Sequence, residues 1–198
     1  VLGTAMGFLI CFIRSSRFHL ARLGAKVFIR ILQGMPIVLF LMILYYLVFA
    51  SISIDPLLVA VIGFSLNFAA YVSEMIRSGI EAVDKGQLEA ASAMGFGKVR
   101  TFVKITLPQA ARFFLPVYQG EFINMIKMTS VVGYIAIQDL TKMSDIIRSR
   151  TYEAFFPLIV TALLYFLIAY AFILLLTWIE KSIDPKQRRR VLKGVVLK

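Results

Sequence analysis

The sequence predicts an all-α membrane protein with about five transmembrane helices, and three observations carry this prediction. Of the 198 residues, 60% are hydrophobic and the mean hydropathy is +0.83, whereas a soluble domain is usually closer to half apolar. Uncharged stretches near the length that spans a bilayer as a helix, about 20 residues, recur along the chain. Between two of them lies a polar, helix-prone loop, residues 81–108. We expect residues 1–198 to form one transmembrane domain, with this loop in the cytoplasm.

The chain opens with two contrasting stretches. Residues 1–13 are apolar and uncharged, but they are too few to span about 30 Å of hydrocarbon. We therefore expect the sequence to begin inside its first transmembrane helix. Residues 14–30 place Lys and Arg side chains among aliphatic ones, which predicts a basic amphipathic segment at a cytoplasmic interface.

Four further apolar stretches predict the remaining membrane helices. Residues 37–54 and 56–73 are uncharged and predict the second and third. A fourth is expected from Phe113 onward, and the last is predicted by the 26 uncharged residues 154–179. Proline or glycine can bend or break a membrane helix near membrane depth. In the fourth helix these residues are Pro116, Gly120 and Gly133.

The loop between the third and fourth helices predicts a helix, a glycine turn and a second helix. Asp84 can cap the first helix, with Gln87 three residues later as in a capping box. Gly95 is suited to end it, because glycine readily adopts a positive φ. Pro108 is expected to end the second helix or to begin the next one. In this second helix the apolar and basic residues fall on opposite faces: Val99, Phe102, Val103 and Thr106 against Lys98, Arg100 and Lys104.

Seven residues of this loop resemble the EAA loop of ABC-importer permeases: Glu89, Ala90, Ala91, Gly95, Ile105, Leu107 and Pro108. In that family the loop forms a short coupling helix that docks into a groove on a cytoplasmic ATPase. The resemblance implies the same ATPase-coupling role here for Glu89, Ala90, Ala91, Gly95, Leu107 and Pro108. Without it, the loop would be an ordinary pair of amphipathic interfacial helices.

Two sets of polar residues lie inside the predicted membrane helices. Asn67, Tyr71 and Glu74 share one face of the third helix, and Glu121, Asn124 and Lys127 line roughly one side of the fourth. Ionisable residues in a membrane usually face a water-filled cavity or a partner. Both sets are therefore candidates for a substrate pathway, with contacts between helices as the alternative. Residues 121–130 resemble the matching helix of polar amino-acid permeases.

The basic residues are distributed asymmetrically along the chain. Residues 14–30, 77–112 and 180–198 hold 18 of the 22 Lys and Arg residues. Because cytoplasmic loops carry an excess of Lys and Arg, these segments are predicted to be cytoplasmic. The expected protein is thus a multi-pass protein of a prokaryotic cytoplasmic (inner) membrane, with the N-terminus outside and the C-terminus inside. This asymmetry explains the net charge of +11 without nucleic acid, and the basic tail is expected to contact membrane lipid.

The sequence lacks the residues of a catalytic centre. It has no phosphate-binding Gly-x-x-x-x-Gly-Lys-Ser/Thr loop, no metal-binding cluster and a single cysteine, Cys11. We expect no catalytic residue, no metal and no cofactor on this chain. The resemblance implies that ATP and Mg are bound by a partner ATPase dimer, that a second permease subunit, identical or different, completes the pathway, and that an extracytoplasmic binding protein delivers a polar amino acid or similar small solute.

Two other functions stay open on the residues. An ion-coupled secondary transporter could use Glu74, Glu121 and Lys127 as coupling sites, although many such folds contain paired inverted halves. A membrane scaffold subunit would transport nothing. Neither alternative explains the loop at residues 81–108.

Overall fold

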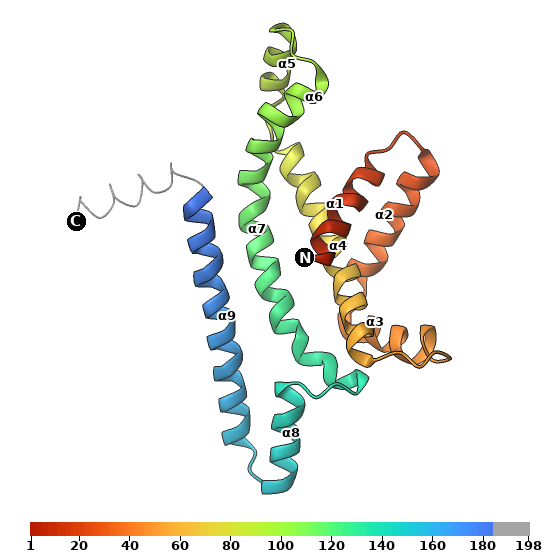
Figure 1. Cartoon of the computed structure of the whole chain (residues 1–198), viewed down its shortest axis with the longest axis vertical. Helices are drawn as coiled ribbons and strands as arrows, with labels where there is room; N and C mark the ends of the chain where they lie inside the picture. Colours follow the sequence, from red (N-terminus) through yellow and green to blue (C-terminus); the bar gives the residue numbers. More distant parts are fainter. Residues whose placement is uncertain (184–198) are drawn as a thin grey trace, which may run out of the picture. The chain divides into compact units, whose positions relative to one another are not determined.

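The computed structural model describes residues 1–183, and within them all regular secondary structure is helical, which confirms the all-α prediction (Figure 1). The chain divides into two compact units, Val1–Lys142 and Met143–Lys198. Most of the predicted basic tail lies outside the described residues, and the single-domain prediction for residues 1–198 stays a prediction. The helical elements of the first unit begin and end as follows: α1 Leu2–Arg14, α2 His19–Gly34, α3 Ile37–Ile43, η1 Leu44–Val48, α4 Pro56–Glu81, α5 Lys85–Ala93, α6 Lys98–Thr101, η2 Phe102–Thr106, α7 Leu107–Met128 and η3 Thr129–Ile135.

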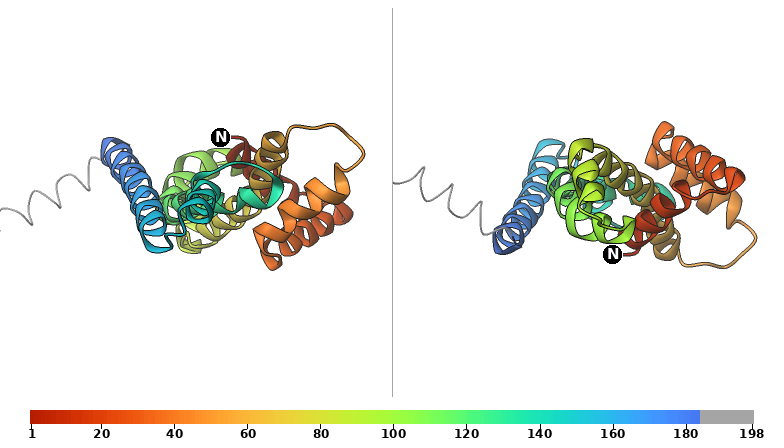
Figure 2. Two further views of the ribbon diagram at one scale, coloured as in Figure 1. Left: turned by 90° about the horizontal axis from the view of Figure 1, so that it is seen from below. Right: turned by 90° about the horizontal axis from the view of Figure 1, so that it is seen from above.

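Helix α4 is the centre of the first unit. It contacts α1, α2, α3 and α7, and it lies between α7 on one side and α2 with α3 on the other (Figure 2). Asp55 caps it by accepting a hydrogen bond from the Leu57 N–H at 2.8 Å, and Pro56 occupies the first turn. Both residues suit a helix start, because Asp satisfies a free N–H and Pro needs none. The helix continues eight residues beyond the predicted Ser73, to Glu81.

Helix α1 packs closely on α4 through two glycines. A Cβ atom at Gly7 would lie 2.6 Å from the Val72 Cβ, and one at Gly3 would lie 2.9 Å from the Ser65 carbonyl oxygen. Small residues let two membrane helices approach, because no side chain holds their backbones apart. The face of α1 that carries Gly3 and Gly7 therefore lies directly against the buried side of α4.

We expect Gly7→Ala to destabilise the first unit by about 1–3 kcal/mol, the usual cost of overpacking. The measurement is the thermal unfolding midpoint in detergent. The matched control is Gly24→Ala in α2, where a Cβ meets nothing within 4 Å and alanine favours the helix by about 0.5–1 kcal/mol. A Gly7→Ala protein as stable as the Gly24→Ala protein would contradict the close packing of α1 on α4.

The second membrane helix, predicted over residues 37–54, is shorter in the structure. Helix α3 continues only through the π-helical η1 to Val48, so the pair rises about 18 Å at 1.5 Å per residue, short of the hydrocarbon thickness. The pair is bent by 111° from α2. Met35, before Pro36, is extended with φ −115° and ψ 135°, because a residue preceding proline disfavours the helical conformation. The side chains of Ile29 and Leu32 on α2 are buried against Ala70 of α4.

Helix α7 is not broken at two of the three residues that could bend or break it. It continues through Pro116 and Gly120, and regular α-helix ends only at Met128, before the 3-10 segment that contains Gly133. Pro108 lies in the first turn of α7, as predicted, but the chain reaches it through the π-helical η2 without a break. A π turn widens the helix, which removes the clash between a proline ring and the carbonyl four residues earlier. The helical path is therefore continuous from α6 into α7.

The second unit contains most of α8 (Leu140–Thr151) and all of α9 (Phe155–Ile183). By length and composition, α4 and α9 can each cross a membrane, and a third span results if α2 with α3 and η1 counts as one. Helix α7 is long enough, with 22 residues, but it is not among these candidate spans. The polar side chains of Glu121, Asn124 and Lys127 lower its mean hydropathy. A helical membrane fold is thus confirmed, while the count of five stays a prediction.

Candidate functional site

The helix–turn–helix loop predicted at residues 81–108 forms around α5. The Asp84 carboxylate accepts a hydrogen bond from the Gly86 N–H at 2.7 Å and caps the helix as predicted. The second half of the predicted capping box is absent, because the side-chain oxygen of Gln87 instead accepts a hydrogen bond from the amide of Gln109. This bond joins the first turn of α5 to the first turn of α7.

Gly95 ends α5 as predicted, with φ +77°. The Gly95 N–H donates to the Ser92 carbonyl and the Phe96 N–H donates to the Ala91 carbonyl, both at 3.0 Å. This pair of bonds is the Schellman motif, which needs a left-handed residue after the helix. The turn also brings the Arg100 guanidinium over the Phe96 ring, 4.5 Å from its centroid, a cation–π contact that ties α6 to the turn.

The residues assigned to ATPase coupling divide into inward and outward positions. Ala91 is fully buried, at 0% exposure, and lets α5 lie close to the helix that follows. Glu89, Ala90 and Gly95 are exposed, as are Leu107 and Pro108 in the first turn of α7. A groove of about 410 Å³ lies beside α5, with Ala90 and Met94 on one wall and Lys104 and Arg112 on the other. The outward face thus combines a carboxylate, small side chains and a basic groove.

The second helix of the loop presents an exposed apolar face. Val99 is 78% exposed, and Phe102 and Val103 are exposed beside it. Thr106, predicted on the same face, is buried instead. The π turn of η2 explains this error, since each residue of a π-helix rotates less than the 100° of an α-helix. Within residues 1–183 nothing covers this apolar face, which is a common property of a protein-binding surface.

The structure places the polar residues of α4 between helices. The buried Asn67 amide donates to the Leu32 carbonyl of α2 at 3.3 Å. Glu74 pairs with Arg14 at the end of α1 and with Arg77 one turn further along α4. Tyr71 is half-buried on the same helix. Asn67 and Glu74 therefore join helices, which was the alternative to a pathway role.

The polar residues of α7 lie outside its main packing face. Tyr118, Phe122 and Met125 pack on the cluster formed by α1 and α4, whereas Glu121 and Asn124 are half-buried and Lys127 is exposed. A cavity of about 500 Å³ lies between α1, α4 and the end of α7, lined by Gly3, Phe68, Met125 and Thr129 among others. None of the six predicted pathway residues lines it.

Sequence reasoning missed Arg14 and Arg77 as partners of Glu74. Arg77 also pairs with Glu81, so its partners lie three and four residues away in α4, a spacing that the sequence displays. Arg14 is 60 residues from Glu74, and no local pattern connects them. Among the described residues, no group of three or more His, Cys, Asp or Glu side chains is placed to hold a metal ion.

These features define a class of protein. A helical membrane chain that carries an exposed helix–turn–helix between α4 and α7 has the architecture of a membrane transport subunit. The chain belongs to the family of binding-protein-dependent transport system inner membrane components, whose family model matches residues 1–189.

Relatives and solved structures agree with this assignment. The chain is 34% identical to the putative glutamine transport system permease protein GlnP of Rickettsia typhi, over 94% of this chain and 84% of the relative. It is 38% identical to the probable amino-acid ABC transporter permease protein YckA of Bacillus subtilis, over 84% of this chain and 74% of the relative. A crystal structure of an amino acid ABC transporter with histidines matches with a TM-score of 0.83 and 35% identity, covering 91% of this chain and 85% of that one.

An inward-facing structure of the MetNI methionine ABC transporter matches with a TM-score of 0.65 at 17% identity, over 92% of this chain and 93% of that one. At this identity the likeness shows the shared fold alone. Together the comparisons identify an ABC importer permease of the polar amino-acid group, a multi-pass protein of the inner membrane. Of the three functions that the residues left open, they support this one.

Proposed function

We propose that this chain forms part of the pathway for a polar amino acid or similar small solute, and that α5 is its coupling helix. The ATP and Mg would be bound by a cytoplasmic ATPase dimer, so this chain is not itself an enzyme. A second permease subunit, identical or different, would complete the pathway, and an extracytoplasmic binding protein would deliver the solute. The observation that carries the proposal is α5 itself, a capped helix with Ala91 buried and Glu89 and Ala90 exposed.

The connections of α5 support this role. Three residues separate its start at Lys85 from the end of α4 at Glu81, and the helical path from α6 continues through η2 into α7. Helices α4 and α7 pack closely beyond the loop, since a Cβ atom at Gly79 would lie 2.9 Å from the Ala110 carbonyl oxygen. A force on α5 would therefore reach two packed membrane helices, which is how ATP hydrolysis would act on the pathway.

The test is reconstitution with the cognate ABC ATPase and binding protein in proteoliposomes. We expect co-purification of the ATPase with this chain, and uptake of radiolabelled polar amino acids that requires ATP. An ion gradient in place of ATP should drive no uptake. Uptake driven by the gradient alone, or failure of the ATPase to co-purify, would reject the proposal.

We also propose that the loop and the C-terminus face the cytoplasm and the N-terminus faces outside. The support is the clustering of Lys and Arg residues in three segments. In a Cys11→Ala background, a cysteine at Lys98 or Lys198 should resist an impermeant thiol reagent added outside. A cysteine at Asp55 or Asp145 should react with it. Labelling of position 98 from outside would contradict this orientation.

Glu121, Asn124 and Lys127 remain our candidates for contact with the solute, together with Tyr71. Glu74 is paired with arginines, which leaves Lys127, exposed on α7, available for a carboxylate of the solute. The double variant Glu121→Gln with Lys127→Met should reduce uptake by about tenfold or more, since a charge-assisted hydrogen bond contributes about 1.5–3 kcal/mol. Stimulated uptake at the normal rate, with an unchanged range of amino acids, would exclude both residues from recognition.

A further inference from the structure

We infer that a chain of alternating charges, Arg14–Glu74–Arg77–Glu81, makes α1 move together with the loop end of α4, and so carries the motion of α5 to a third membrane helix. Arg14 and Glu74 position the end of α1 relative to α4 through their ion pair. The inference rests on the proposed coupling role of α5, and it adds a route from that helix to α1.

The four side chains form a continuous series of ion pairs. One oxygen of the Glu74 carboxylate pairs with the Arg14 guanidinium and the other accepts from Arg77, whose Nε lies 3.0 Å away. The far side of the Arg77 guanidinium pairs with Glu81. The Arg14 side chain is 19% exposed and that of Glu74 is 34% exposed. Charges that are largely withdrawn from water need their partners, because an unpaired one is costly.

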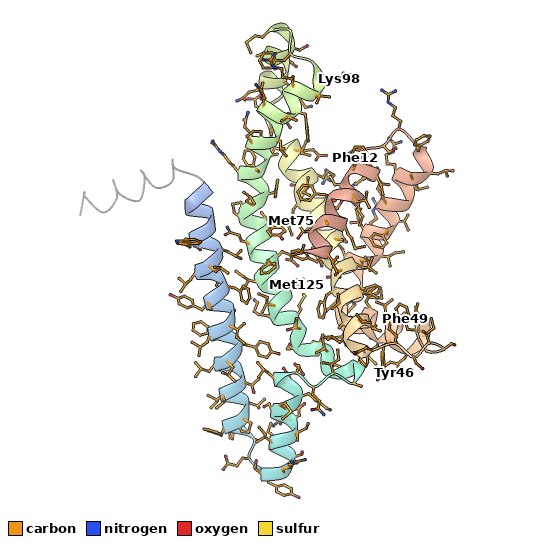
Figure 3. All side chains as sticks on the ribbon, viewed as in Figure 1. Phe12, Tyr46, Phe49, Met75, Lys98 and Met125 are labelled. Carbon is orange, nitrogen blue, oxygen red and sulfur yellow. The ribbon has the colours of Figure 1, made fainter. Side chains whose placement is uncertain are left out.

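The ion pairs lie near the end of α4 that leads into the loop, where a motion of α5 would first reach the membrane helices. Arg14 is the last residue of α1, and Glu81 is the last residue of α4, separated from α5 by three residues. Figure 3 shows Phe12, near the end of α1, between the levels of Met75 on α4 and Lys98 in the loop. The ion pairs therefore connect the loop end of α4 with the adjacent end of α1.

Helix α1 has a different attachment at its other end. There the Thr4 and Tyr118 hydroxyls share a hydrogen bond at 2.7 Å, and Gly3 and Gly7 pack on α4. Within residues 1–183, Arg14–Glu74 is the ion pair that joins α1 to α4. Apolar packing on α4 extends along α1 from Gly3 to Cys11, which is buried in one cluster with Ile76. Without the ion pair, the last turn of α1, beyond Cys11, could lag behind α4.

The experiment measures the ratio of solute imported to ATP hydrolysed in proteoliposomes containing the ATPase and the binding protein. We expect Arg14→Met to lower this ratio about fivefold or more, the lower range of a coupling between sites, while the ATPase still co-purifies. Arg14→Lys, which keeps a positive charge, should stay within about twofold of the parent protein. The matched control is Arg148→Met, which removes the Asp145–Arg148 ion pair of α8 and should leave the ratio unchanged.

A distance measurement covers the case in which Arg14→Met fails to fold. Spin labels at Phe12 and Ala82, in a Cys11→Ala background, report on α1 and on the residue after α4. We expect one distance in the nucleotide-free and vanadate-trapped complexes of the parent protein, and a second population in Arg14→Met if it folds. A nucleotide-dependent change of about 5 Å in the parent, a full helical turn, would overturn the inference.

An unchanged import-to-hydrolysis ratio in folded Arg14→Met would overturn it as well. If the ATPase does not bind even the parent protein, the result would instead reject the proposed coupling role of α5. The two failures are therefore distinguishable.

Discussion

Gly95→Val is expected to abolish solute-stimulated ATP hydrolysis and uptake, while the protein still inserts into the membrane and stays monodisperse in detergent. Gly95 has φ +77°, and a β-branched residue there is strained by about 1–3 kcal/mol. A Cβ at this position meets nothing within 4 Å, so the effect comes from the backbone and not from a collision. The strain would open the Schellman turn, and α6 would leave α5 at a different angle.

Two variants control for the size and polarity of the new side chain. Gly95→Asn should retain most activity, because asparagine tolerates the left-handed conformation. Gly97→Ser should be neutral, since Gly97 caps α6 with an ordinary φ of −68° and serine is a good cap. Hydrolysis and uptake are measured in proteoliposomes, and ATPase assembly by pull-down. Normal stimulated uptake by Gly95→Val would reject α5 as the coupling helix.

Val99→Asp is expected to weaken ATPase binding by at least about 2 kcal/mol, the loss that marks a principal contact residue in an interface. Val99 is 78% exposed on the apolar face of the loop, and a carboxylate would have to lose its water there if a partner covers this face. The substitution does not weaken α6 itself. Position 99 is the second residue of that helix, where the helix dipole favours a negative charge.

The control for Val99→Asp is Tyr152→Asp, which also replaces an exposed apolar side chain by a carboxylate. Tyr152 is 94% exposed, with φ +58°, a conformation that aspartate tolerates. It lies in the segment predicted to face outside, so ATPase binding should not change. Binding is measured by titrating the detergent-solubilised permease with the ATPase. Equal affinities for Val99→Asp and the parent protein would show that this face is not the ATPase contact.

The loop was the part of the molecule most open to prediction from sequence. The Asp84 cap and the Gly95 turn depend on hydrogen bonds spanning two to five residues, and such bonds follow from local residue chemistry. The prediction failed where the local rule was incomplete. Gln87 bonds to Gln109, 22 residues away, and the π turn before Pro108 moved Thr106 from the predicted apolar face to the interior.

The sequence alone determined the helical membrane class, the position of the loop and its family resemblance, because hydropathy and turn chemistry are properties of neighbouring residues. Only the tertiary structure decided which polar residues meet. Asn67 bonds to Leu32 across 35 residues, and Glu74 pairs with Arg14 across 60. The composition of a membrane helix shows that a charge inside it needs a partner. Which partner it finds depends on how the helices pack, since bends such as the one at Met35 and close contacts such as Gly7 on Val72 set the distances between them.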